Sequence, residues 1–136
     1  MMRTIAIVLM AVAGGAFALQ PGQEITLQLA PPVVVKTEPQ AGSDNVDAGL
    51  DRIAVTFSKQ MRAKSWSWVL LTKGSFPQVV GQPKYVADRR TCVLPVKLQP
   101  GKTYAVWINT GRYTGFKDSE GRSAVPYLLV FKTRSE

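Results

Sequence analysis

Residues 91–109 read TCVLPVKLQPGKTYAVWIN, in which two runs of alternating apolar side chains flank a Pro-Gly pair. The apolar members are Cys92, Leu94, Val96 and Leu98 in the first run, and Tyr104, Val106 and Ile108 in the second. An apolar side chain at every second position is typical of a β-strand with one buried face. The pair Pro100-Gly101 is typical of turns, so we predict two strands joined at a corner. Pro95 cannot donate to a ladder, which predicts that the first strand is interrupted or lies at a sheet edge.

The same two-residue period recurs on both sides of this stretch, and it predicts strands at Ile53–Phe57, Trp66–Leu71 and Tyr127–Thr133. The β-branched run Val33–Val35 predicts a first main strand, and Val79–Val80 and Tyr85–Val86 are two short strand pieces. No segment keeps apolar residues at the three-and-four spacing of an amphipathic helix. About seven short strands separated by turn residues are typical of sandwiches and barrels. We therefore predict an all-β, immunoglobulin-like sandwich of two sheets.

The N-terminal end has the pattern of an export signal. Arg3 supplies a positive charge, residues 5–12 are apolar, and residues 16–18 read Ala-Phe-Ala, with small residues where a signal peptidase cuts. This apolar run is far shorter than the roughly 20 residues of a membrane-spanning helix. We predict three segments: a signal peptide over 1–18, a lead-in segment over 19–32 with a short strand at 24–29, and the sandwich domain over 33–134. The alternative for residues 1–18 is a first helix or strand of the domain.

The composition excludes several kinds of chemistry. The chain has no histidine, which removes the commonest general base, the Ser-His-Asp arrangement and most zinc and copper sites. Cys92 is the single cysteine, so it cannot form an internal disulfide, and we expect it to pack as a small buried hydrophobe. An intermolecular bridge is the alternative. The formal net charge of +8 favours an anionic partner, but the basic residues are scattered, which is typical of a solvated surface. Export argues against a nucleic-acid partner.

The carboxylates are few and offer no catalytic pair. A glycosidase needs two carboxylates facing each other across a cleft, whereas Asp118 and Glu120 lie two residues apart in a loop and have the pattern of turn formers. Asp44 with Asp47, or Asp118 with Glu120, could supply oxygen ligands to calcium, although neither spacing is that of a known calcium loop. We predict no catalytic residue, no cofactor and no metal site, and leave calcium open.

Three tryptophans suggest a contact surface. Trp66 and Trp68 share one face of a predicted strand, while Trp107 lies on the face opposite Tyr104 and points outward if Tyr104 is in the core. An outward tryptophan is unusual. The predicted contact surface consists of Trp66, Trp68, Trp107, Arg112 and Tyr113. The alternative is that the lead-in segment or a loop covers Trp107.

From Val33 to Thr133 the chain resembles the bacterial Ig-like domain of SbsA type, a family named after an S-layer protein. The resemblance is carried by the valine-rich run 33–35, Pro39, Gly42 and Val46, the alternating run 53–58 followed by Met61, the motif Leu98-x-Pro100-Gly101-x-x-Tyr104, and Asp118, Gly121, Phe131 and Thr133. The chain has Gln60 before Met61, where the family has proline. The resemblance implies the sandwich fold, but a fold by itself does not fix a function.

Five of these residues also have structural roles that follow from their chemistry. Pro100 and Gly101 let the chain cross from one sheet to the other, and the hydroxyl of Tyr104 can then bond the backbone of the crossing segment. The carboxylate of Asp118 can bond nearby amides, and Gly121 supplies the positive-φ position of the same turn.

The resemblance implies an exported, non-enzymatic module, periplasmic or extracellular. It would have a binding, adhesive or structural role toward a protein or an envelope polymer, and no membrane span in the mature chain. A carbohydrate-binding module would expose its tryptophans, and an enzyme would show a cleft with convergent polar groups. A spacer or assembly protein would instead show an unpaired sheet edge or an apolar patch.

Overall fold

The computed structural model describes residues 20–135, and the predicted signal peptide, residues 1–18, lies outside that range. Between residues 20 and 135 the chain forms eight β-strands and one short 3-10 helix, η1, with no α-helix. The bounds are β1 Val34–Glu38, β2 Arg52–Phe57, β3 Trp68–Leu70, η1 Lys73–Ser75, β4 Gln78–Val79, β5 Lys84–Tyr85, β6 Thr91–Lys97, β7 Thr103–Ile108 and β8 Tyr127–Lys132. The predicted all-β class is confirmed.

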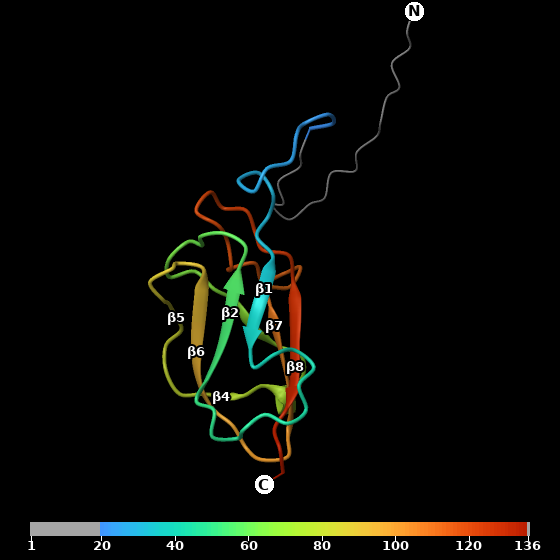
Figure 1. The fold of residues 1–136 in the computed structure, drawn as a ribbon, viewed down its shortest axis with the longest axis vertical. Helices are drawn as coiled ribbons and strands as arrows, with labels where there is room; N and C mark the ends of the chain where they lie inside the picture. Colours follow the sequence, from blue (N-terminus) through green and yellow to red (C-terminus); the bar gives the residue numbers. More distant parts are fainter. Residues whose placement is uncertain (1–19, 136) are drawn as a thin grey trace, which may run out of the picture.

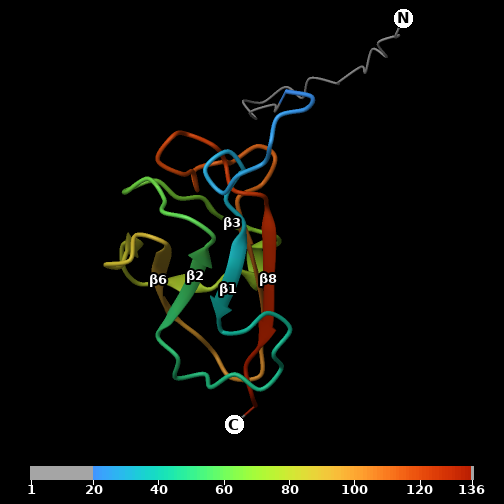
Figure 2. The same ribbon diagram turned by 45° about the horizontal axis from the view of Figure 1, so that its top comes forward.

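The strands form two antiparallel sheets, as an immunoglobulin-like sandwich requires (Figure 1). The larger sheet has the order β1-β2-β6-β4, and β5 pairs with β6 on the same side as β4. The smaller sheet has the order β3-β7-β8. The lead-in segment lies at one end of the sandwich and the C-terminus at the other, as both views show (Figures 1 and 2).

The core lies between the two sheets and follows the two-residue period. In β6 the side chains of Cys92, Leu94 and Val96 are buried while their neighbours are not, and β7 buries Tyr104, Val106 and Ile108. The opposing strands add further fully buried side chains, namely Ile53, Val55, Phe57, Leu129 and Phe131. Burying each large apolar side chain contributes about 1.5–3 kcal/mol relative to exposure.

Pro95 lies within β6, and β6 is an interior strand of the larger sheet rather than an edge. On one side β6 pairs continuously with β2. On the other side its partner is interrupted, because β4 pairs with residues 96–97 and β5 with residues 92–93. Pro95 faces this interruption, where Val80 N donates to Pro95 O at 3.0 Å. The missing N–H therefore leaves no ladder bond unmade.

Residues 24–29 form no strand, so that prediction is wrong. Leu29 N and Ala30 N both donate to Thr26 O, at 3.2 and 2.9 Å, which makes a turn. Ile25 and Leu27 are 58% and 70% exposed. The alternating pattern is present, but no strand of the described chain lies beside it, and an isolated strand cannot satisfy its backbone groups in a ladder.

Candidate binding groove

An apolar groove lies at one side of the sandwich, between β3 of the smaller sheet and the β4–β5 side of the larger sheet. Its volume is about 780 Å3. Its lining is almost entirely apolar and includes Trp66, Trp68, Leu70, Phe76, Val79, Pro83, Leu94 and Tyr113. We call this feature the groove.

The groove exists because both sheets end in short strands on this side. β3 has three residues, and β4 and β5 have two each. Trp68 and Leu70 pair with Ile108 and Val106 of β7, whose side chains are fully buried. Opposite residues of an antiparallel pair share a face, so Trp68 and Leu70 also face the space between the sheets. Leu70 is nevertheless 51% exposed, because the larger sheet does not cover it.

Trp68 forms the inner wall of the groove. Its ring meets Phe116 edge to face at a centroid distance of 5.3 Å. It also lies beside Cys92, where burial raises the pKa of the thiol to about 12 and the Trp68 side chain lowers it only in part. Cys92 is fully buried and unpaired. A thiol with so high a pKa is no nucleophile at neutral pH.

Trp66 forms the outer end of the groove. It packs on Tyr85 in a tilted arrangement at 6.4 Å, and the Tyr85 hydroxyl donates to Ser65 O at 3.0 Å. Burial, and then the charge of Cys92, raise the pKa of Tyr85 far above its ordinary value. A second hollow of about 510 Å3 continues past Trp66 and Pro83 and is flanked by Lys64 and Lys84.

Gly115 fastens the Trp66–Trp68 segment to the loop that follows β7. Its amide donates to Ser67 Oγ at 2.7 Å, and its carbonyl accepts from Ser65 Oγ. The same loop is held from inside by Asn109, which is fully buried. Asn109 Nδ2 donates to the carbonyls of Phe116 and Ala124, and its Oδ1 accepts from Phe116 N. These bonds fix Tyr113, carried by the loop, at the rim of the groove.

The outer edge of β3 has no partner strand among the described strands. Asn109 N donates to Ser67 O at 3.1 Å, so the backbone groups of Ser67 face β7. Because these groups alternate along an antiparallel strand, those of Val69 also face β7, and those of Trp68 and Leu70 face outward. The groove therefore combines apolar side-chain space with free backbone donors and acceptors.

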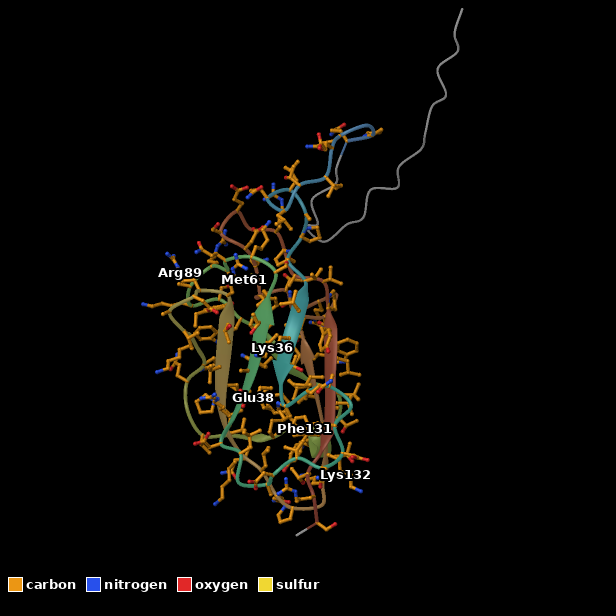
Figure 3. The ribbon with its side chains drawn as sticks, viewed as in Figure 1. Lys36, Glu38, Met61, Arg89, Phe131 and Lys132 are labelled. Carbon is orange, nitrogen blue, oxygen red and sulfur yellow. The ribbon has the colours of Figure 1, made fainter. Side chains whose placement is uncertain are left out.

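Two further edges of the sandwich, those of β1 and β8, are protected. Lys36 and Glu38 lie along β1 (Figure 3), and Pro39 follows directly after it. Charges and proline discourage pairing at a sheet edge. The edge of β8 is covered by residues 42–46, through bonds such as Gly42 N to Val130 O at 2.7 Å and Lys132 N to Ser43 O at 2.8 Å. Ser65–Thr72, by contrast, contains no charged residue.

The predicted contact residues do not all come together. Trp66, Trp68 and Tyr113 line the groove. Arg112 lies over the ring of Tyr113, 5.5 Å from its centroid. Trp107 lies on the opposite face of β7, between Val69 and Leu128, and is half-buried away from the groove. Sequence reasoning missed the groove residues Leu70, Phe76, Val79, Pro83 and Leu94.

The corner residues lie where the chain changes sheets, between β6 and β7. The Tyr104 hydroxyl accepts from Gln99 N at 2.8 Å, and its ring stacks on Phe131 at 5.5 Å. Gly101, which follows Pro100, has a φ of 64°, and its amide donates to Arg134 O.

Asp118 organises the turn at the lead-in end. Its Oδ1 accepts from Glu120 N at 3.0 Å and from Arg122 N at 2.8 Å, and Gly121 has a φ of 89°. Its Oδ2 lies 2.9 Å from Lys59 Nζ. Burial alone would raise the pKa of Asp118, but the bonds from Lys59 and the two amides, with the Lys59 charge, hold it below its usual value. Among residues 20–135 no group of three or more acidic, histidine or cysteine side chains could hold a metal.

The chain is similar to known proteins in sequence family and in fold. Residues 28–133 match the model of a family described as bacterial Ig-like domain. Domains 1–6 of the surface layer protein SbsC are similar in structure, with a TM-score of 0.51, 19% identity, and coverage of 80% of this chain and 14% of that chain. The S-layer protein rSbsC(31-844) gives a TM-score of 0.49, 20% identity, and coverage of 79% and 14%. The chain thus spans 14% of the length of these proteins. The likeness to SbsC domains 1–6 is one of fold. No curated protein matches the chain.

Proposed function

The chain belongs to the bacterial Ig-like domain family, and from this membership we propose that it is an exported, non-catalytic module that holds a partner in the groove. Its place would be the cell envelope or the outside of the cell, with residues 1–18 acting as a signal peptide. As part of the same proposal, the domain is of the SbsA-type subclass. No helix among the described residues is long and apolar enough to cross a membrane.

One observation carries the binding role: the unpaired edge of β3 borders an apolar groove. Exposed apolar edges without charges are usually avoided in soluble sandwiches, because they pair with other chains. Where such an edge is kept, an extended segment can add to it as a further strand, with the backbone giving affinity and alternate side chains filling pockets. Leu70 and Leu71 are 51% and 47% exposed at this edge.

The polarity of the groove favours an apolar partner over a sugar. A bound glycan needs hydrogen-bond partners for its hydroxyls as well as aromatic faces. Several polar groups beside the tryptophans are already engaged: Ser67 Oγ accepts from Gly115 N, and the Tyr85 hydroxyl donates to Ser65 O. A carbohydrate or envelope polymer stacked on Trp66 or Trp68 is the alternative, supported by the partial exposure of both residues.

The test is sedimentation of the purified protein with cell envelopes isolated from its own bacterium. Leu70→Lys places a charge in the groove and should weaken binding about tenfold or more, the size of effect expected at the centre of an interface. Val35→Lys is the matched control, since Val35 is 59% exposed on β1, in the other sheet, and should bind as the unchanged protein does. Equal binding by Leu70→Lys would remove the groove from the proposal.

Binding of a glycan in the groove can be tested separately, by tryptophan fluorescence. Trp66 and Trp68 line the groove, so a bound sugar should change tryptophan fluorescence during titration with solubilised envelope polysaccharide. A saturable change that Leu70→Lys abolishes would favour the polymer over a protein partner. A flat titration beside intact envelope binding would favour the protein.

A further inference from the structure

The lead-in segment has the sequence of a strand and no strand to pair with. Its residues 25–29 alternate as Ile-Thr-Leu-Gln-Leu. The backbone hydrogen bonds of residues 20–30 are confined to the segment itself, apart from two that Lys59 Nζ donates to Gln28 O and Ala30 O, both at 2.9 Å. Among residues 20–135, Leu27 is the most exposed large hydrophobic residue at 70%, and Ile25, at 58%, comes just after Val35. An apolar face left in water is a cost unless something covers it.

Residues 20–28 of the segment are exposed, whereas Leu29 and Ala30 are half-buried where Lys59 holds the segment to the domain. Val125 N donates to Pro32 O at 3.0 Å, which fixes the chain just after the segment. Pro31 and Pro32 favour an extended backbone at that point. The segment projects beyond the end of the sandwich, as the blue part of the ribbon shows in both views (Figures 1 and 2).

The groove has the shape that such a strand needs. The outward backbone groups of Trp68 and Leu70 offer a ladder, and the side chains of the same two residues line the groove. A segment added along β3 would therefore direct every second side chain into the groove. Ile25, Leu27 and Leu29 have that spacing, and Thr26 and Gln28 would face water.

The charges of the two surfaces are complementary. Residues 19–32 carry one charge, that of Glu24. Residues 52–87 contain six basic residues and no acidic one. Two of them, Lys64 and Lys84, flank the hollow that continues the groove. A strand placed along β3 would bring a single carboxylate to a rim that carries only positive charge.

We propose that residues 24–29 of one copy add as a strand to the free edge of β3 in a second copy, with Ile25, Leu27 and Leu29 seated in the groove. This deepens the proposed function, since it names the occupant of the same groove. The donor segment and the acceptor edge are different surfaces of the chain, so the contact is head to tail. A head-to-tail contact repeats from molecule to molecule, and it builds a ring where the rotation closes and an open chain where it does not.

The experiment measures mass against concentration, by light scattering and sedimentation velocity, on the protein expressed with its own leader. The unchanged protein should grow beyond a dimer as concentration rises. Leu27→Asp and Leu70→Lys should each weaken assembly about tenfold or more. Both sites are largely exposed, at 70% and 51%, so both variants should keep the circular dichroism spectrum of the unchanged protein. Val35→Lys should assemble normally.

Cysteine pairing tests the contact between the segment and β3 directly. Chains carrying Leu27→Cys, mixed with chains carrying Leu70→Cys and oxidised, should form a disulfide between the two chains. A mixture of Leu27→Cys with Val35→Cys should not. Cys92 is fully buried and should not take part.

Two results would overturn the proposal. The first is that the unchanged protein stays a monomer at every concentration. If Leu70→Lys nevertheless weakens envelope binding, the groove keeps its proposed binding function, with an occupant other than a second copy. The second result concerns one chain that carries both Leu27→Cys and Leu70→Cys. If this chain forms an internal disulfide and keeps the mass of a monomer, the segment occupies the groove of its own chain.

Discussion

Lys59 Nζ lies 2.9 Å from Asp118 Oδ2, and the same ammonium donates to the carbonyls of Gln28 and Ala30. One side chain thus joins the lead-in segment to the turn at residues 118–122. The Asp118 side chain is 2% exposed, so its charge depends on this ammonium and on the amides of Glu120 and Arg122. The position at which a calcium ion would meet Asp118 Oδ2 is filled by a lysine.

This relationship makes stability depend on pH. The pKa of Asp118 is lowered from 3.8 in the folded protein, so the folded state favours the ionised form. Its contribution to the free energy of unfolding is complete well above pH 3.8 and is lost as pH falls through the lower, folded value. Urea unfolding from pH 2 to pH 7 should show Asp118→Asn less stable than the unchanged protein at neutral pH, with the difference shrinking below pH 3.8. A pH-independent difference would contradict this assignment.

Tyr104→Phe should cost about 1–3 kcal/mol in the free energy of unfolding, because it leaves the Gln99 amide without its acceptor. The ring and its stack on Phe131 would remain. The matched control is Tyr113→Phe, whose side chain is 50% exposed at the groove rim, and which should stay within about 0.5 kcal/mol. Denaturant titration measures both, and the m-value should not change. Equal stability of the two variants would remove the corner role from the Tyr104 hydroxyl.

Gly115→Ala should destabilise the protein by about 1–3 kcal/mol through overpacking. A Cβ at this position would lie 2.6 Å from Ser67 Oγ and would collide with Trp66 O. The clash displaces the segment that carries the groove tryptophans, so their fluorescence should shift as well. Gly111→Ala is the control in the same loop, since a Cβ there meets nothing within 4 Å. If both substitutions prove neutral, Gly115 does not fasten the segment.

Cys92 should resist alkylation in the folded protein. Burial raises its pKa to about 12, and its side chain has no exposed surface. Reaction with iodoacetamide at pH 8 then requires the core to open, which slows it on the order of 1000-fold or more relative to the protein in urea. Val35→Cys supplies an exposed thiol on the same chain, and mass spectrometry should show one rapid modification there. Rapid loss of both thiols would mean that the core around β6 opens easily.

Local sequence patterns predict most of the strands of this fold. Two runs have an apolar side chain at every second position and predict strands with one buried face. The structure buries all six of these side chains, namely Cys92, Leu94, Val96, Tyr104, Val106 and Ile108. This works because a strand's side chains alternate whatever lies beside it. The same logic fails at residues 24–29, where the pattern is present and no strand forms, since a ladder also needs a neighbour.

Sequence alone determined the class of the fold, the corner between residues 98 and 104, and the absence of histidine chemistry, because each depends on residue type and on spacing along the chain. Only the tertiary structure decided that the edge of β3 stays open beside the groove and which aromatic residues meet. The groove is assembled from residues 66–70, 76, 79, 83, 94 and 113, which are brought together because the two sheets pack on each other and end early on the same side. Trp66 and Trp68 reach it, whereas Trp107 does not, because β7 turns its alternate side chains to the opposite face of the sheet.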